Sequence, residues 1–249
     1  MKPAVLVTGG AKRIGAVLAR AFGEAGWHVV IHYGRSRDEA EELARKLPSA
    51  QSIQCDLADL DAATRMIAKL EKQLEDWRVL INCAGVFRLD DARNLDPAVF
   101  DQAVTVNAAS PARMAQAFLS NDMSRPARRV IQVTDQKLAN PNPDFFSYTM
   151  SKHALASTIA MLSMARPRLA DRIYGIAPGA ILPSHDQNST EVERSHRMNL
   201  LARKTGANEI ADAALFLAQG WLSSGETIYV DSGQHLLRQP RDVLFLARQ

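Results

Sequence analysis

Short apolar runs alternate along the chain with longer stretches in which apolar residues recur every three to four positions. The short runs are typical of buried strands, and the longer stretches have the spacing of amphipathic helices. The strands predicted in this way are residues 4–8, 27–33, 52–55, 79–82, 129–134, 172–176 and 227–230. The helices predicted between them are residues 14–26, 38–47, 61–74, 97–119 and 147–164.

Strands that alternate with helices predict a parallel sheet with helices on both faces, which is an α/β fold. The chain has 249 residues, with no linker rich in Pro, Gly or Ser and no internal repeat, so one domain over residues 1–249 is expected. A chain of this length buries roughly 70–75% of the surface that its unfolded form exposes, so it needs no disulfide or metal to fold.

Composition narrows the possible functions. Hydrophobic residues make up 47% of the chain, and no stretch is long and apolar enough to span a membrane. The net charge of +3 suits an anionic small ligand, and no dense Lys/Arg block indicates nucleic-acid binding. The two cysteines form no C-x-x-C pattern, so no metal site is predicted. The N-terminus does not resemble a signal peptide, so a cytoplasmic protein is expected.

A tyrosine and a lysine lie one turn apart on the predicted helix 147–164. Tyr148 and Lys152 are four residues apart, so their side chains share one face. A cation beside a phenol lowers its pKa from about 10, which would let Tyr148 transfer a proton near neutral pH. Asp135 precedes Tyr148 by 13 residues and, if it lies beside the phenol, opposes that shift. We therefore treat these three residues as one coupled titrating unit.

A glycine-rich turn joins the first predicted strand to the first helix. Gly9 and Gly15 allow a tight turn in which backbone N–H groups and a helix N-terminus hold a pyrophosphate. The second strand is followed by Arg35 and Ser36, and the nearest acid, Asp38, already lies in the next helix. Because an arginine there suits the 2′-phosphate of NADP whereas an acid suits the ribose of NAD, the sequence favours NADP(H).

With these features the chain resembles the short-chain dehydrogenase/reductase family over residues 5 to about 236. The landmarks of that family occur here in order, namely Thr8-Gly9 with Gly15, Asp56-Leu57, Asn82-Cys-Ala-Gly85, Asn107, Tyr148 with Lys152, and Pro178-Gly179. The resemblance implies a Rossmann-type, doubly wound sheet of seven parallel strands and hydride transfer between a nicotinamide and a substrate. It also implies a homotetramer or homodimer.

The resemblance assigns roles to individual residues. It implies that Tyr148 donates the proton, that Lys152 binds the nicotinamide ribose, and that Asn107 supports a water relay. Asp56 and Leu57 would contact the adenine. The residues expected to contact the cofactor are Gly9, Lys12, Arg13, Ile14, Gly15, Tyr33, Arg35, Ser36, Asp56, Leu57, Asn82, Ala84, Gly85, Thr134, Lys152, Pro178, Gly179 and Ile181.

Two departures from the general family are similar to one of its branches. Arg13 stands where the family has a glycine, and Asp135 stands where it usually has a serine. Both match the pteridine reductase branch, including bacterial dihydromonapterin reductases, in which an aromatic residue at the position of Phe87 stacks on the pterin. The resemblance therefore implies a substrate site made of Arg13, Phe87, Asp135 and Tyr148. Some members have a serine where this chain has Gly85, which puts one polar contact in doubt.

Two segments near the C-terminus are expected to shape the substrate pocket. Residues 183–203 are polar and could cover the substrate as a mobile segment. Within it His185 and Asp186 are candidate lining residues, with a solvated loop as the alternative for both. Residues 238–249 extend beyond the usual end of the branch. Their apolar run, 243–247, is expected to pack on its own subunit or a neighbour, near the pocket or an oligomer interface.

The leading interpretation is an NADPH-dependent reductase of a pterin-like small molecule, either a dihydropterin or a dihydrofolate-like substrate. One alternative is a carbonyl reductase of the same fold, acting on a ketone or oxoacyl group. Asp135 disfavours it, because a hydroxyl group is the better donor to a carbonyl oxygen. The second alternative is an NADP-sensing protein without turnover, which the intact pair of Tyr148 and Lys152 disfavours.

Overall fold

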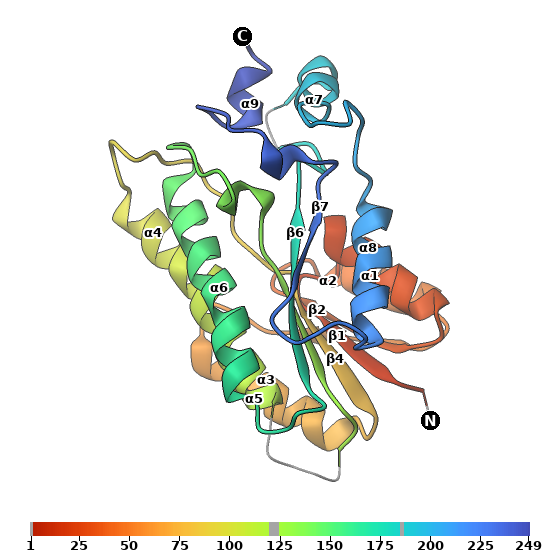
Figure 1. Ribbon diagram of the computed structural model, residues 1–249. Helices are drawn as coiled ribbons and strands as arrows, with labels where there is room; N and C mark the ends of the chain where they lie inside the picture. Colours follow the sequence, from red (N-terminus) through yellow and green to blue (C-terminus); the bar gives the residue numbers. More distant parts are fainter. Residues whose placement is uncertain (1, 120–124, 185–186) are drawn as a thin grey trace.

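Seven parallel strands form one sheet in the order β3-β2-β1-β4-β5-β6-β7 in the computed structural model, which describes residues 2–119, 125–184 and 187–249 (Figure 1). The strands are β1 (Ala4–Val7), β2 (His28–Tyr33), β3 (Ala50–Gln54), β4 (Trp77–Asn82), β5 (Arg129–Val133), β6 (Arg172–Pro178) and β7 (Thr227–Val230). All seven predicted strands are present, and the predicted doubly wound α/β fold is confirmed.

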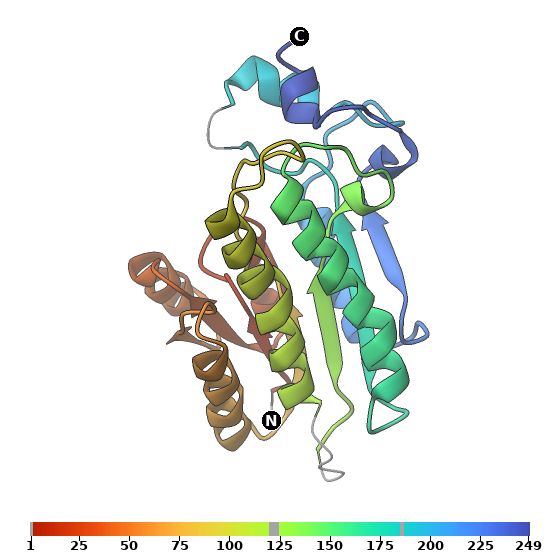
Figure 2. The ribbon, with the colours of Figure 1, turned by 90° about the vertical axis from the view of Figure 1, so that its left-hand side faces the viewer.

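Helices cover both faces of the sheet. One face carries α1 (Arg13–Glu24), α2 (Arg37–Lys46) and α8 (Ala207–Ala218). The other carries α3 (Leu60–Gln73), α5 (Ser110–Phe118) and α6 (Phe146–Ala165), which lie side by side in Figure 2. The shorter elements are α4 (Pro97–Val104), η1 (Thr105–Ala109), η2 (Gln136–Leu138), α7 (Ser189–Ser195), η3 (Gln234–Leu236) and α9 (Val243–Leu246). Among the described helices, none is both long and apolar enough to cross a membrane.

Helix α8 is missing from the elements that the hydrophobic pattern predicts. Its buried residues Ile210, Ala214 and Leu217 nevertheless have helical spacing, and they join the apolar core on the face of the sheet shared with α1. The Glu209 carboxylate accepts a hydrogen bond of 2.8 Å from the Gly206 N–H, which satisfies a backbone donor at the start of the helix. Three of the five buried residues of α8 are alanines. Because alanine is only weakly hydrophobic, the repeat of apolar residues that marks a helix is hard to detect in this part of the sequence.

The predicted helix 97–119 contains a π-helical turn, η1, between α4 and α5. Such turns often occur at functional sites. Asn107 lies within it, and its Oδ1 accepts a hydrogen bond of 2.8 Å from the Val86 N–H. Its Nδ2 donates to the Val86 carbonyl oxygen and to Ser151 Oγ, both at 2.9 Å. The turn therefore ties α6 to the chain that follows β4.

The order of the strands locates the crevice of the fold. The chain after β1 continues to β2 on one side of the sheet, and the chain after β4 continues to β5 on the other side. The loops that follow the carboxyl ends of β1 and β4 therefore diverge and leave a crevice between them. Thr8 holds the base of this crevice together, since its hydroxyl oxygen accepts hydrogen bonds from the N–H groups of Cys83 and Ala84 at 3.0 and 3.1 Å. Helices α7 and α9 lie above the carboxyl ends of the strands (Figure 1).

Candidate active site

A cavity of about 460 Å³ opens at the carboxyl ends of the central strands, a size typical of small-molecule sites. It brings together most of the residues that the sequence predicts for a site. Those that line it are Gly9, Lys12, Arg13, Ile14, Gly15, Ala84, Gly85, Phe87, Thr134, Asp135, Tyr148, Lys152, Pro178, Gly179 and Ile181. The predicted residues outside its lining are Tyr33, Arg35, Ser36, Asp56, Leu57, Asn82 and Asn107.

Asp135 and Tyr148 meet inside the cavity. The phenol donates a hydrogen bond of 2.7 Å from Oη to Asp135 Oδ2. The other carboxylate oxygen, Oδ1, accepts a hydrogen bond of 2.8 Å from the Lys137 N–H, which fixes the orientation of the carboxylate. Burial raises the pKa of Asp135 above its ordinary value. Burial, followed by the adjacent Asp135 carboxylate, raises the pKa of Tyr148 well above 10.

Lys152 lies on the same face of α6 as Tyr148, and its Nζ is 5.7 Å from the centre of the tyrosine ring. The ammonium donates a hydrogen bond of 2.7 Å to the carbonyl oxygen of Val133. Burial lowers the pKa of Lys152. In this structure desolvation and the Asp135 carboxylate set the direction of the Tyr148 pKa shift, which is opposite to the one that a neighbouring cation alone would cause. The role of Lys152 in lowering that pKa when a cofactor is bound stays a prediction.

Phe87 belongs to an aromatic stack at the cavity. Its ring lies nearly parallel to that of Phe145, with centroids 4.1 Å apart, and meets Tyr148 edge-on at 4.7 Å. Phe145 in turn stacks on Phe245, at 6.0 Å. Phe87 remains 42% exposed, so part of its ring is open to a ligand. The sequence did not single out Phe145, and it placed Phe245 only within an apolar run expected near the pocket or an interface, because residues this far apart in the chain meet only in the folded structure.

Two residues at the site have a left-handed backbone. The φ angle is 52° at Arg13 and 51° at Phe145, a conformation that costs a residue other than glycine about 1–3 kcal/mol. Glycine adopts this conformation without that cost, which is consistent with the glycine that the family has at the position of Arg13. Its guanidinium donates a hydrogen bond of 3.1 Å from Nη2 to the carbonyl oxygen of Pro183, on the segment after β6. Strain of this kind is common at ligand-binding sites.

The glycine-rich turn is packed too closely for side chains. A Cβ atom added to Gly15 would lie 2.1 Å from the Gly9 carbonyl oxygen. One added to Gly9, whose φ is +63°, would lie 3.0 Å from Ala84 Cα. Helix α1 begins after Lys12, and among the described residues no side chain caps its first turn. Bare backbone beside free helical N–H groups fits a pyrophosphate, so these residues would hold the phosphates of a dinucleotide.

His32, which the sequence did not single out as a site residue, fixes this turn to the second and third strands. Its Nδ1 accepts a hydrogen bond of 3.1 Å from the Gly9 N–H, and its Nε2 lies 3.0 Å from the Cys55 carbonyl oxygen. Burial lowers the pKa of His32 to about 4, so the ring is neutral at pH 7 and Nε2 carries the proton. A polar histidine within the largely apolar second strand could have indicated that the side chain has a structural hydrogen-bonding role.

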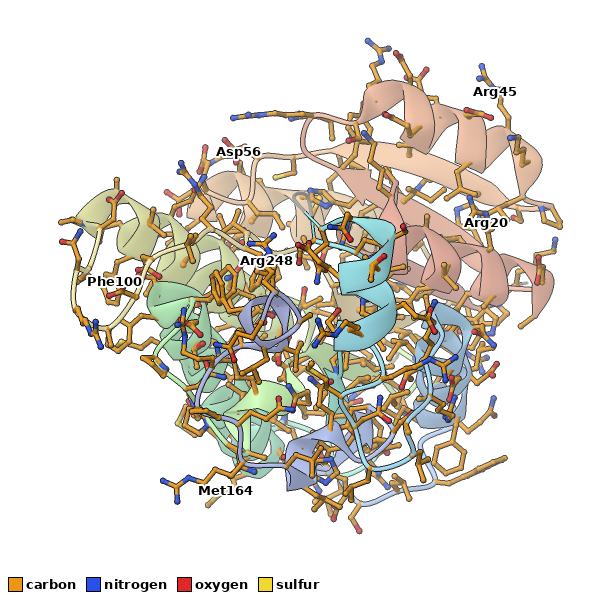
Figure 3. All side chains as sticks on the ribbon, turned by 90° about the horizontal axis from the view of Figure 1, so that it is seen from above. Arg20, Arg45, Asp56, Phe100, Met164 and Arg248 are labelled. Carbon is orange, nitrogen blue, oxygen red and sulfur yellow. The ribbon has the colours of Figure 1, made fainter. Side chains whose placement is uncertain are left out.

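The residues predicted for the adenine end lie at the ends of β2 and β3. Arg35 is exposed, and Ser36 precedes α2, on whose first turn the structure describes no side-chain cap. The Asp56 carboxylate accepts a hydrogen bond of 3.0 Å from the Ala58 N–H, whereas the Leu57 side chain is buried in the core. Asp56 is labelled in Figure 3, which looks down on the carboxyl ends of the strands, and it lies beside the N-terminal part of the ribbon, drawn in pale red to orange. Their contacts with a cofactor stay predictions.

The side chains of Asn82 and Asn107 bond both main-chain and side-chain groups behind the cavity lining. Asn82 Nδ2 donates hydrogen bonds to Gln132 Oε1 at 2.9 Å and to the Pro111 carbonyl oxygen at 3.3 Å. Asn107 is engaged with the segment after β4, so its part in a water relay stays a prediction. A Cβ atom on Gly85 would lie 3.2 Å from Asn107 Oδ1, so a serine at that position would be crowded.

The polar segment 183–203 borders the cavity. Ser184, Gln187 and Ser195 line it, and α7 begins with a capping box on Asn188. His185 and Asp186, the other candidates in this segment, lie outside the described residues. The described part of the chain contains no cluster of His, Cys, Asp and Glu side chains suited to a metal ion.

Comparisons with known proteins agree with this geometry. The sequence profile of a family described as Enoyl-(Acyl carrier protein) reductase matches residues 9–235. Pteridine reductase 1 of Leishmania tarentolae is 27% identical and aligns with 95% of this chain and 97% of its own. The 3-oxoacyl-(acyl-carrier-protein) reductase FabG of Staphylococcus aureus is also 27% identical, over 95% and 99% of the two chains. The crystal structure of FolM alternative dihydrofolate reductase 1 from Brucella suis in complex with NADP has a TM-score of 0.87, with 31% identity over 96% of each chain.

We expect His32→Asn to reduce the loss of stability that the protein suffers on acidification. In the unfolded chain His32 binds a proton near its ordinary pKa of 6.5, whereas in the folded protein it does so only near 4, so lowering the pH favours unfolding. Between about pH 7 and about pH 5 the variant should therefore lose about 2 kcal/mol less unfolding free energy than the wild type, as measured by urea denaturation. The exposed His153→Asn is the control, and equal pH dependence in all three proteins would contradict the assignment.

Proposed function

The chain belongs to the short-chain dehydrogenase/reductase family, and we propose that it is an NADPH-dependent reductase of a dihydropterin or a dihydrofolate-like substrate. The observation that carries the proposal is the 2.7 Å hydrogen bond from Tyr148 to Asp135 inside the cavity. Arg13 and Phe87 line the same cavity. The likeness to pteridine reductase 1 and to FolM supports the same substrate class.

NADP(H) is the proposed cofactor. Members of this family use NAD(P)H, and the Brucella FolM structure contains NADP. In this chain Gly9, Gly15 and the start of α1 would hold the pyrophosphate, and the exposed Arg35 would bind the 2′-phosphate. When bound, NADPH supplies the hydride.

Tyr148 is the proposed proton donor. Because its pKa is raised, the phenol is protonated at neutral pH and gives up its proton only to an atom that gains basicity during the reaction. A pterin ring nitrogen becomes such an atom when the neighbouring carbon accepts hydride. The ammonium of Lys152 then stabilises the phenolate, and Asp135, which accepts the phenol hydrogen bond beforehand, holds the ring in place. The three groups titrate together.

A flat heteroaromatic ring fits the remaining surface of the cavity. Stacking on the exposed part of Phe87 would contribute about 0.5–1.5 kcal/mol beyond the burial of apolar area. The Arg13 guanidinium, held by Pro183, would donate hydrogen bonds to acceptors on the ring edge or on the cofactor phosphate. The alternative function, a carbonyl reductase, remains a candidate because the chain is as similar to FabG as to pteridine reductase 1, with 27% identity to each. An ionised Asp135 works against it, because a carboxylate has no hydrogen to donate to a carbonyl oxygen.

The direct test is NADPH oxidation with dihydrobiopterin, dihydromonapterin, dihydrofolate and a panel of simple ketones. We expect turnover on at least one of the first three. Turnover on ketones alone would reject the pterin proposal in favour of a carbonyl reductase. NADPH binding without turnover on any compound would favour the sensing protein.

Replacing Tyr148 with Phe should remove the proton donor while leaving the cofactor site intact. We expect kcat to fall about 100-fold or more, since general acid catalysis contributes about 10²–10⁴-fold. NADPH affinity, measured by fluorescence titration, should stay near the wild-type value. Tyr229→Phe, at a tyrosine that is 40% exposed, is the matched control. Unchanged turnover in Tyr148→Phe would exclude the tyrosine from the mechanism.

Arg35→Ala should weaken NADPH far more than NADH, because only NADPH carries the 2′-phosphate. We expect the Kd for NADPH to rise about tenfold or more, the loss of roughly one charged hydrogen bond, with little change for NADH. The control is Arg37→Ala, whose side chain is exposed and pairs with Glu41 at 2.7 Å. Equal weakening of both cofactors would contradict the role of Arg35.

A further inference from the structure

The C-terminal segment, residues 238–249, folds back over the carboxyl ends of the strands and forms part of the cavity wall. Asp242, Val243 and Leu244 line the cavity, and the two apolar residues are buried. In Figure 3 the labelled Arg248 lies near the middle of the molecule, above the sheet. The sequence left open whether this end packs on its own subunit or on a neighbour, and in the structure it packs on its own chain at the cavity.

Several contacts hold the segment in place. The buried Asp144 carboxylate accepts hydrogen bonds from Arg241 Nε at 2.8 and 2.9 Å and from the Asp242 N–H at 2.8 Å. The Phe245 ring stacks on Phe145 at 6.0 Å, and Arg194 Nη1 donates to the carbonyl oxygen of Ala247 at 3.0 Å. With these contacts, the side chains that face the cavity have fixed positions.

Asp242 forms an ion pair with a buried lysine at the cavity. Asp242 Oδ2 lies 3.5 Å from Lys137 Nζ, which also donates a hydrogen bond to the Asp144 carbonyl oxygen. Both ions line the cavity, although the Lys137 side chain is only 5% exposed and that of Asp242 18%. An ammonium has three N–H donors and a carboxylate oxygen accepts more than one hydrogen bond, so the pair keeps hydrogen-bonding capacity for a ligand.

The pair lies beside the proposed proton donor. Lys137 follows Asp135 by two residues, and its own N–H is bonded to the Asp135 carboxylate. Its Nζ is 5.5 Å from the centre of the Phe145 ring, which stacks on Phe87. Asp242 comes from the chain after β7, at the opposite edge of the sheet from β3. A substrate ring at Tyr148 and Phe87 would therefore direct a substituent toward this pair.

We infer that Lys137 and Asp242 bind a neutral, hydroxylated substituent on the substrate ring, and that the C-terminal segment thereby determines substrate specificity. This inference rests on the proposed function. A hydroxyl group can donate to Asp242 and accept from Lys137 at once. An anionic substituent would gain nothing from a pair without net charge, and it would have to disrupt that pair, which is costly for buried ions.

The test compares two substrates that differ only in the substituent, 6-hydroxymethyl-7,8-dihydropterin and 6-methyl-7,8-dihydropterin, with NADPH and full-length protein. Asp242→Asn keeps the shape of the side chain and an acceptor for the Leu244 N–H, but removes the charge. We expect its KM to rise about tenfold for the hydroxymethyl compound and less than twofold for the methyl compound, with kcat little changed. Lys137→Met should give the same selective rise.

Asp96→Asn is the matched control, because Asp96 caps α4 as Asp242 caps α9 but is exposed and does not line the cavity. NADPH affinity and thermal midpoint are measured for every variant, so that a folding defect is recognised. Equal changes in KM for both substrates, or no change for either, would overturn the inference while leaving the proposed function intact. Failure of the wild type to reduce either dihydropterin would reject the inference, and it would reject the proposed function as well only if dihydrobiopterin, dihydromonapterin and dihydrofolate also gave no turnover.

Discussion

The reversal of strand order between β1 and β4 is the constraint on which the site depends. Parallel strands place all their carboxyl ends at one edge, and the reversal makes two adjacent loops diverge there. Thr8, at the end of β1, accepts hydrogen bonds from two backbone N–H groups at the end of β4. His32 accepts a hydrogen bond from the Gly9 N–H and so fixes the turn that follows β1. The turn can then remain bare backbone, because neighbouring strands rather than its own side chains hold its shape.

Desolvation controls the chemistry within this frame. Tyr148, Asp135 and Lys152 are enclosed together, so burial disfavours the charged form of each group, whatever its sign. The phenol therefore keeps its proton in the absence of a reacting partner, and the hydrogen bond to Asp135 gives that proton a defined position. The spacing of a tyrosine and a lysine on one helix face could not reveal this balance, because it depends on what surrounds them.

The sequence predicted the fold well where the apolar pattern was strong. All seven strands were located, most of them from dense apolar runs, whereas the alanine-rich α8 was missed because its buried face gives a weak period. For the site, motifs identified the glycine-rich turn, Tyr148, Asp135 and Phe87, all of which line the cavity. Asn82 and Asn107 match the same family pattern but do not line the cavity, and their side chains bond neighbouring groups of the protein, among them Gln132 Oε1 and the Val86 N–H.

By itself, then, the sequence determined the order of the strands, the glycine-rich turn after the first strand and the pairing of Tyr148 with Lys152 on one helix face, because local spacing encodes all three. Only the tertiary structure decided which way the pKa of Tyr148 shifts and which side chains complete the cavity. Asp242 and Phe245 lie about a hundred residues along the chain from Lys137 and Phe145, their partners. No local pattern encodes such contacts, since they form only when the C-terminal segment packs across the sheet.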